Sequence, residues 1–186
     1  METKVPKEVL EVARKLEEKG LEAYFVGGCV RDILLGRDPK DWDIATNAEP
    51  ARIQEIFPES VYENNFGTVV IKDGPEVTTY RKEGKYTDKR HPDVVKFAKT
   101  IKEDLARRDF TINAIAMSLK SELVDPFGGQ EDLRNRVIRT VGEADERFNE
   151  DALRLMRAVR LAAELDFGIE KKTADAIKNN TALLEM

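Results

Sequence analysis

Two aspartates separated by one residue, Asp41 and Asp43, constrain what this chain can fold into more than any other feature. Side chains at positions i and i+2 of a β-strand point to the same face of a sheet. A strand over residues 41–45 would therefore place both carboxylates on one face and bury Trp42 and Ile44 on the other. Paired hard-oxygen ligands of this kind hold Mg²⁺ against phosphate groups. The alternative is a solvated surface turn that carries two acids.

A glycine pair and an arginine lie just upstream of the aspartates: Gly27, Gly28 and Arg31. Glycines let backbone N–H groups approach phosphates closely. The guanidinium group of an arginine offers a fork of donors that matches phosphate oxygens. The segment lacks the third glycine of a dinucleotide-binding fingerprint, and a plain turn beside a surface arginine is the alternative. Together with the aspartates, this segment predicts a nucleotidyl-transfer site.

Handling an incoming 3′-hydroxyl needs a third oxygen ligand or a base, and Glu76 is the best candidate. It begins a predicted strand, and a place next to the aspartate strand would bring it to the same edge of the sheet. In a two-metal mechanism one ion activates the hydroxyl and the other neutralises the triphosphate. An ordinary carboxylate on an edge strand is the alternative.

Residues 107–113, Arg-Arg-Asp-Phe-Thr-Ile-Asn, are dense in charge for a segment that precedes a buried helix. Adjacent arginines cannot share one helix face. We therefore expect either Arg107 or Arg108 to point to the site and the other to pair elsewhere, with Asp109 fixing one of them. A solvated linker is the alternative. Residues 81–108 carry ten Lys and Arg against five Asp and Glu, a local charge of +5, which predicts contact with nucleic acid through phosphates.

Acids and arginines alternate where a helical stretch opens near residue 150. An aspartate can accept from a base amino group while an arginine donates to ring acceptors, so the two together could read the hydrogen-bonding edge of a base. Ordinary i, i+4 charge pairs on a solvated helix are the alternative. The residues concerned are Glu150, and then Asp151, Arg154 and Arg157 on a neighbouring face at i, i+3 and i+6, followed by Arg160.

Periodicity and turn signals predict one helix, then mixed strands and helices, then helices alone. We expect the last two strands before residue 81 to form a hairpin, residues 81–92 to form an exposed loop, and 94–97 to close the sheet. The fold class is therefore α+β, with a mixed or antiparallel sheet in a head over 1–140 and an all-helical neck over 141–186. The predicted helices are 6–19, 30–35 and 50–57, and the predicted strands are 23–26, 41–45, 68–71, 77–80 and 94–97.

Composition excludes several classes of protein. With 186 residues, 41% of them hydrophobic, the chain can bury a real core in one domain with or without a small appendage. A net charge of −5 argues against a protein that coats nucleic acid over its whole surface. The single cysteine, Cys29, excludes internal disulfides and a Cys-based zinc site and fits a reducing compartment. Without a long apolar run or a signal segment, we expect a cytoplasmic location and no membrane partner.

Taken together, the motifs resemble those of the class II tRNA nucleotidyltransferases (CCA-adding enzymes) and the related bacterial poly(A) polymerases and A-adding enzymes. These belong to the DNA polymerase β-like nucleotidyltransferase superfamily, and the resemblance runs from about residue 22 to the C-terminus. It implies a polymerase-β-like head in which Gly27, Gly28 and Arg31 bind the triphosphate. Asp41 and Asp43 would bind catalytic Mg²⁺, with Glu76 as a further carboxylate.

The resemblance also implies a nucleotide pocket beyond the carboxylates. The loop at 84–93 is similar to the family's flexible loop, which helps the pocket switch from C to A. The pocket residues would be Arg108 and Asp109 at sugar or phosphate, Asp151 and Arg154 at the base of CTP or ATP, and Arg157 and Arg160 in support.

The implied activity is Mg²⁺-dependent, template-independent addition of C and/or A from CTP and ATP to the 3′ end of tRNA, with release of pyrophosphate. An A-adding enzyme or a poly(A) polymerase is the alternative within this class, because these enzymes share the motifs. A non-catalytic nucleotide- or RNA-binding fragment is the alternative outside it. Family members usually continue beyond the neck into domains that hold tRNA, so the neck is expected to be truncated here. The sequence does not decide the oligomeric state.

Overall fold

A mixed β-sheet lies at the centre of the part of the chain that precedes the C-terminal helices. The computed structural model describes residues 5–62, 66–84, 86–87 and 94–185. Within these residues, seven strands form one sheet in the order β3-β4-β5-β2-β1-β8-β9. Strands β2 and β5 run parallel, and the other neighbouring pairs are antiparallel. The strands are β1 (Ala23–Val26), β2 (Asp43–Thr46), β3 (Val61–Tyr62), β4 (Thr68–Val70), β5 (Glu76–Thr79), β8 (Ala116–Ser118) and β9 (Leu123–Val124).

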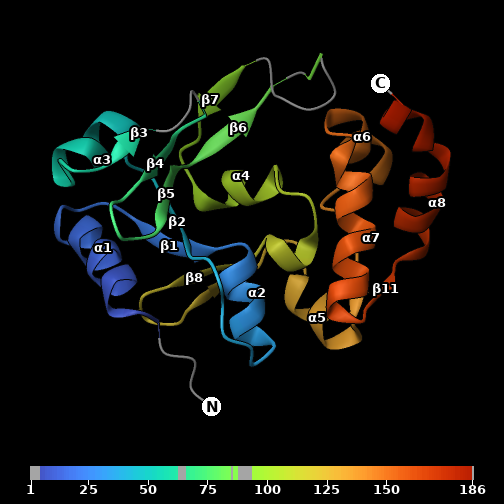
Figure 1. Cartoon of the computed structure of the whole chain (residues 1–186), viewed down its shortest axis with the longest axis horizontal. Coiled ribbons are helices and arrows are strands. Elements are labelled where there is room, and N and C mark those ends of the chain that lie inside the picture. The colour runs from blue at the N-terminus through green and yellow to red at the C-terminus, as the bar shows by residue number, and fades with distance from the viewer. Residues whose placement is uncertain (1–4, 63–65, 85, 88–93, 186) are drawn as a thin grey trace.

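Helices cover the sheet and then form a group of their own (Figure 1). In that view α6, α7 and α8 stand together on the C-terminal side of the molecule, and α4 lies between them and the sheet. Helix α6 packs against both α7 and α8. The helices are α1 (Lys7–Glu18), α2 (Gly28–Leu34), α3 (Pro50–Ile56), α4 (Ile101–Ala106), α5 (Gly129–Asn135), α6 (Ala144–Glu150), α7 (Leu153–Leu165) and α8 (Lys171–Asn179), with 3₁₀ turns η1 (Thr111–Asn113) and η2 (Thr181–Glu185).

Both faces of the sheet are buried, because successive side chains of a strand alternate between them. Phe25 and Ile44 pack on one face in an apolar cluster that includes residues of α1 and α3. Val26 and Ala45 face the other way, into a second cluster with Leu105 of α4. This alternation places Asp43 on the same face as Ala45, the face that α4 covers.

The α+β class and several elements predicted from the sequence are confirmed. The helix over 6–19, the strand over 23–26, the helix over 50–57 and the hairpin around 72–75 are present. Closure of the sheet by 94–97 is wrong: β7 (Val95–Phe97) pairs with β6 (Arg81–Glu83) in a separate two-stranded sheet. The segment after residue 80 is therefore a strand where a loop was expected. Of the predicted flexible loop, residues 85 and 88–93 lie outside the described residues.

The C-terminal region is helical apart from one short strand. Asp166 ends α7 in the left-handed conformation, with φ of 57°. The chain then extends as β11 (Gly168–Ile169) and pairs in parallel with β10 (Val137–Ile138). The expectation of helices alone is therefore wrong at this strand, which ties the helical region to the head. Among the described residues, no helix is both long and apolar enough to cross a membrane.

Candidate active site

The two aspartates predicted as metal ligands lie at the start of β2. The observed strand begins at Asp43, two residues later than the predicted one, so Asp41 precedes it. Trp42 lies edge-on against Phe25, with ring centroids 5.6 Å apart, and so points into the core as expected. Asp41 and Asp43 both line a cavity of about 470 Å³.

The charge of Asp43 is opposed by its surroundings. Burial raises the pKa of Asp43; the Arg108 guanidinium lowers it and the Asp41 carboxylate raises it, so the pKa lies above its ordinary value. A bound cation would favour the ionised form of both carboxylates. The donor set therefore fits a hard cation such as Mg²⁺.

Glu76 lies directly beside Asp43, because the two residues are register partners in the parallel pair β2–β5. It also lines the cavity that holds the aspartates. Within the described part of the chain, however, no group of three or more His, Cys, Asp and Glu side chains is placed to hold a metal ion. Mg²⁺ is commonly bound by one or two carboxylates, with substrate phosphates and water completing its shell. Asp41 and Asp43 share one cavity, and their role as metal ligands stays a prediction.

Gly27 allows a close approach between two charged side chains. Its φ is +76°, a conformation that other residues rarely adopt. A Cβ atom at this position would lie 3.0 Å from Arg108 Nη1 and 3.5 Å from Asp43 Oδ2. The glycine therefore leaves room at the same turn for both the Arg108 guanidinium and the Asp43 carboxylate.

Arg31 lies next to the second glycine, as the sequence predicted. A Cβ atom on Gly28 would be 3.6 Å from Arg31 Nη2. The guanidinium is held by Asp32, to which Nε donates at 2.9 Å, and by Asn113, to which Nη1 donates at 2.9 Å. These contacts fix the plane of the Arg31 guanidinium beside the glycine turn.

The two adjacent arginines separate as expected, but a different acid holds them. Arg108 points to Gly27 and Asp43, whereas Arg107 pairs away from the aspartates. Asp104 binds both, at 3.0 Å to Arg107 Nε and 3.3 Å to Arg108 Nη2. The prediction that Asp109 fixes one of the pair is therefore wrong, because the chain turns after α4 and directs Asp109 away from them.

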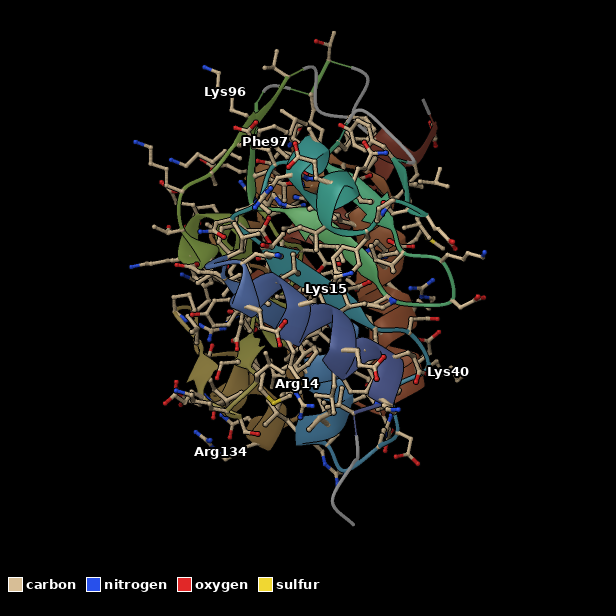
Figure 2. All side chains as sticks on the ribbon, turned by 90° about the vertical axis from the view of Figure 1, so that its left-hand side faces the viewer. Arg14, Lys15, Lys40, Lys96, Phe97 and Arg134 are labelled. Carbon is tan, nitrogen blue, oxygen red and sulfur yellow. The ribbon has the colours of Figure 1, made fainter. Side chains whose placement is uncertain are left out.

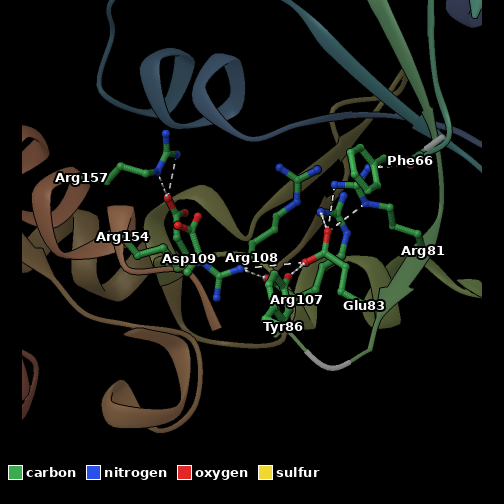
Figure 3. Close-up of a pocket in the computed structure, with 10 residues that line it drawn as sticks. Phe66, Arg81, Glu83, Tyr86, Arg107, Arg108, Asp109, Arg154 and Arg157 are labelled. Atoms are coloured by element: carbon green, nitrogen blue, oxygen red, sulfur yellow. Dashed lines mark hydrogen bonds and ion pairs between the residues drawn. The ribbon is translucent and has the colours of Figure 1, made fainter. Parts of the chain in front are cut away.

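Asp109 binds an arginine of the helical region instead. Arg157 Nη2 lies 2.7 Å and Arg157 Nε 2.9 Å from Asp109 Oδ2 (Figure 3). Asp109 is 8% exposed. It therefore joins the end of the head's α4 segment to α7.

A cavity of about 320 Å³ lies between β6, the turn after α4 and the start of α7 (Figure 3). It brings together the predicted nucleotide residues Arg108, Asp109, Asp151, Arg154 and Arg157. Arg160 is not among its lining residues; its side chain is 59% exposed and lies 3.6 Å from Glu164. The other lining residues are Phe66, Arg81, Glu83, Tyr86 and Arg107.

The predicted acid–arginine helix is interrupted, although its side chains still share the cavity. Helix α6 ends at Glu150 and α7 begins at Leu153, so Asp151 lies between two helices and not on one face with Arg154. Asp151 Oδ1 accepts from the Leu153 N–H at 2.9 Å, which satisfies a free donor of α7. The predicted i, i+3, i+6 face is therefore wrong.

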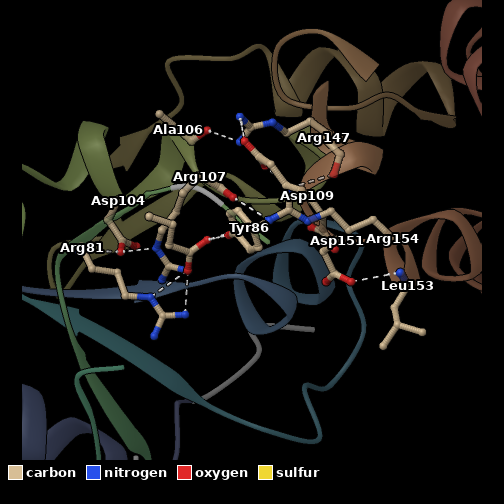
Figure 4. A network of polar contacts seen from close by, with 12 residues as sticks. Arg81, Tyr86, Asp104, Ala106, Arg107, Asp109, Arg147, Asp151, Leu153 and Arg154 are labelled. Atoms are coloured by element: carbon tan, nitrogen blue, oxygen red, sulfur yellow. Dashed lines mark hydrogen bonds and ion pairs between the residues drawn. The ribbon is translucent and has the colours of Figure 1, made fainter. Parts of the chain in front are cut away.

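Arg154 is a buried part of the site and not surface decoration. It is 7% exposed, and its Nη1 donates to Glu150 Oε2 at 2.6 Å. Its Nη2 donates to the Arg107 backbone oxygen at 3.3 Å (Figure 4). The two arginine-rich segments predicted separately are thus hydrogen-bonded to each other.

Glu83 and Asp104 neutralise the cavity arginines, and neither was singled out from the sequence. Burial opposes the charge of Glu83, but Arg107, the Tyr86 hydroxyl and Arg81 outweigh it, so the pKa of Glu83 lies below its ordinary value. Burial likewise opposes the charge of Asp104, and Arg107 together with Arg108 holds its pKa low. The i, i+3 and i+4 spacing of Asp104 to the two arginines was the signal that could have found it.

The family model that matches the chain describes the Poly A polymerase head domain and covers residues 23–139. The chain belongs to this family. It is also 52% identical over 186 residues to the CCA-adding enzyme of Lactobacillus delbrueckii subsp. bulgaricus, covering 98% of this chain and 47% of that protein. The chain thus spans about half the length of the curated relatives it matches. The resemblance inferred from the motifs is confirmed.

Solved structures of the family share the fold. The Bacillus stearothermophilus CCA-adding enzyme in complex with CTP has a TM-score of 0.86 and 49% identity, over 96% of this chain and 44% of that one. A tRNA nucleotidyltransferase complexed with a primer tRNA and an incoming ATP analog has a TM-score of 0.76 and 36% identity, over 92% of this chain and 50% of that one. These likenesses confirm the nucleotidyltransferase head fold.

The basic segment over 81–108 is only partly exposed where the structure describes it. Its lysines at 82, 96, 99 and 102 are exposed, whereas its arginines at 81, 107 and 108 are mostly buried in ion pairs. Lys96 and Phe97 project from the edge of the β6–β7 hairpin (Figure 2). Lys82, opposite Lys96 on the hairpin, pairs with Glu103 at 2.5 Å. The basic residues at 85, 89 and 90 lie outside the described residues, so the RNA contact stays a prediction.

Proposed function

We propose that this chain carries the nucleotidyl-transfer chemistry of a CCA-adding enzyme. It would add C and A from CTP and ATP to the 3′ end of tRNA, without a template, and release pyrophosphate. The proposal is supported by about 50% identity to a named CCA-adding enzyme and by the likeness to structures solved with CTP, or with primer tRNA and an ATP analog. We propose a cytoplasmic location, which agrees with a tRNA substrate and with a single, buried, free cysteine.

The observation that carries this proposal is the position of Arg108. Its guanidinium lies beside Gly27 on the side where Asp43 also lies, and the same residue lines the cavity at the start of α7. A nucleoside triphosphate has the same layout, with a base at one end and phosphates that must meet cations at the other. One extended arginine therefore spans the two halves of such a ligand.

The phosphate end would be held by side chains that are already oriented. Arg31 is fixed by Asp32 and Asn113, which leaves donors on its terminal nitrogens for phosphate oxygens. Glycines 27 and 28 would allow the backbone to approach those phosphates. Arg108 would then balance charge near the α-phosphate, where the tRNA 3′-hydroxyl attacks in line.

The base end would be read in the cavity beside α7. Asp151 uses Oδ1 to cap α7, so a base amino group would donate to Oδ2. Arg154 is held by Glu150 and by the Arg107 backbone, which would keep its position constant while C or A is read. Arg157 would complete this wall, and Arg160, which lies outside the lining, would act at most on RNA.

Asp41 and Asp43 would hold Mg²⁺, since their oxygens are the hard ligands this ion prefers and since burial and the neighbouring Asp41 oppose the charge of Asp43. The bound ion would supply neutralisation of the triphosphate and activation of the 3′-hydroxyl. Glu76, in register with Asp43, is proposed as a further carboxylate at this edge. We propose a division into a catalytic head over 1–140 and a base-reading neck over 141–186.

Primer extension with Mg²⁺ tests the proposal. The primers are tRNA ending before CCA, tRNA ending in C and tRNA ending in CC, each with CTP, ATP or both. We expect stepwise addition of C, C and A. Addition of A alone would make the chain an A-adding or poly(A) enzyme. No extension of any primer by a folded chain that binds CTP would refute catalysis by this chain and leave a nucleotide-binding fragment.

Matched aspartate variants separate chemistry from folding. Asp41→Ala and Asp43→Ala are expected to reduce extension at least about 1,000-fold, because they remove the metal ligands. Asp38→Ala, a nearby exposed aspartate, should leave extension unchanged. Extension that survives both ligand substitutions would refute the assignment.

A further inference from the structure

Asn113 links two arginines that lie far apart in the sequence. It ends η1, which packs against α2 and α5, and is 7% exposed. Its Oδ1 accepts from Arg31 Nη1 at 2.9 Å, and its Nδ2 donates to Asp109 Oδ1 at 3.3 Å. Asp109 in turn binds Arg157 through its other oxygen. A continuous chain of contacts thus runs from α2 through η1 to α7.

The chemistry of this link requires an amide. Arg31 can only donate, so the atom that faces it must accept; Asp109 as a carboxylate can only accept, so the atom that faces it must donate. A primary amide carries one acceptor and one donor on the same carbon and meets both demands while staying neutral. An aspartate at 113 would place two carboxylates against each other, and an alanine would leave both partners without their contact.

We propose that Asn113 is a positioning residue that sets Arg31 and Arg157 relative to each other. Asn113 is not among the lining residues of either cavity and acts through its two partners. The proposal rests on the proposed function, in which Arg31 meets the triphosphate and Arg157 lies at the base cavity. We infer that a change in the position of Arg31 is transmitted through Asn113 and Asp109 to Arg157 of α7, and the reverse.

The first test needs no nucleotide. We compare hydrogen exchange of the Arg157 Nε–H, measured by NMR, in the unsubstituted chain, in Asn113→Ala and in Thr111→Val. Thr111 lies in the same 3₁₀ turn and bonds to Asp132, outside the link. We expect at least fivefold faster exchange in Asn113→Ala only. Equal rates in all three proteins, or equal acceleration in both variants, would overturn the link, since the second result would reflect a loosened turn.

The second test measures CTP affinity by calorimetry in a double-mutant cycle. Arg31→Lys, Arg157→Lys and the double variant are made with asparagine and with alanine at 113. With asparagine we expect the combined loss to differ from the product of the single losses by about fivefold or more, and with alanine to match it within twofold. The same coupling in both backgrounds would overturn the proposal. Failure of the unsubstituted chain to bind CTP would instead refute the proposed function, while the exchange result still decides the link.

Discussion

Substitution of Asp104 by asparagine is the sharpest test of how the site is held together. Asp104 is 0% exposed and binds Arg107 and Arg108, with a further hydrogen bond at 3.2 Å from the Arg81 N–H. Asparagine has nearly the same shape but no charge. The change therefore removes the anion that faces two guanidinium groups and leaves the packing intact.

The magnitude follows from the burial of these charges. Removing one partner of a buried ion pair destabilises a protein by about 3–5 kcal/mol. Arg107 keeps a second partner in Glu83, at 2.9 Å, and the asparagine oxygen can still accept one hydrogen bond. We therefore expect Asp104→Asn to lower the free energy of unfolding by about 3 kcal/mol, the lower end of that range. For a chain of this length that loss lowers Tm by roughly 6–12 °C.

The loss should depend on pH with a defined sign. The two arginines hold the pKa of Asp104 below its ordinary value of 3.8. A group whose pKa is lower in the folded state stabilises the fold above its unfolded pKa and loses that contribution as pH falls through the folded pKa. The difference between Asp104→Asn and the unsubstituted chain should thus be complete at pH 7 and at pH 5, and shrink below about pH 4.

Urea denaturation at pH 7, 5 and 3.5 measures this difference directly. Asp38→Asn serves as the control, because this aspartate is exposed and should change stability by less than about 0.5 kcal/mol. The reasoning is refuted by a loss below about 1 kcal/mol at pH 7. It is equally refuted by a loss that stays constant on acidification, since packing and not charge would then be responsible.

Three further substitutions test the geometry of the site. Asp43→Asn should raise the urea midpoint at pH 7 while abolishing transfer, because the pKa of Asp43 is raised and its charge therefore destabilises the fold; a lower midpoint would contradict this. Gly27→Ala should cost about 1–3 kcal/mol and weaken CTP binding in calorimetry, since its Cβ would meet Arg108 at 3.0 Å; unchanged affinity would count against the Arg108 contact. Gly129→Ala should lower stability by about 3 kcal/mol, because its Cβ would lie 2.2 Å from a backbone oxygen of η1. Gly20→Ala, with φ +76° and open space around its Cβ, shows the backbone cost alone; equal losses for Gly129→Ala and Gly20→Ala would refute the clash.

Features that depend on local spacing could be predicted from the sequence. Helix α1 follows from apolar residues at helical intervals, and β1 from a short apolar run that ends at a glycine pair. Asp41 and Asp43 line one cavity because only one residue separates them. Even here the start of the strand was predicted two residues too early, since Asp41 lies outside β2.

Features that depend on distant partners could not be predicted. Glu83 was assigned to an exposed loop, yet β6 pairs with β7 and turns it toward Arg107. Glu83 pairs with Arg81 of its own strand and with Arg107 from beyond α4, and no local pattern predicts the second contact. The break between α6 and α7 was missed for a related reason: Asp151 has a helical neighbourhood in sequence, but its carboxylate caps the next helix instead of continuing the first.

Arginine, and not lysine, suits these positions for a geometric reason. Each of three candidate site arginines uses some of its nitrogens to bind a protein acceptor: Arg31 binds Asn113, Arg157 binds Asp109 and Arg108 binds Asp104. A guanidinium has five donors in a fixed plane, so an arginine held in this way can still present donors to a ligand. An ammonium group carries its three donors on one nitrogen, so once it binds a protein acceptor it cannot also present a planar pair of donors to a phosphate. The carboxylates and the amide that bind the arginines therefore orient them and leave some of their donors free for a ligand. Arg→Lys at these sites should weaken nucleotide binding even though the charge is kept.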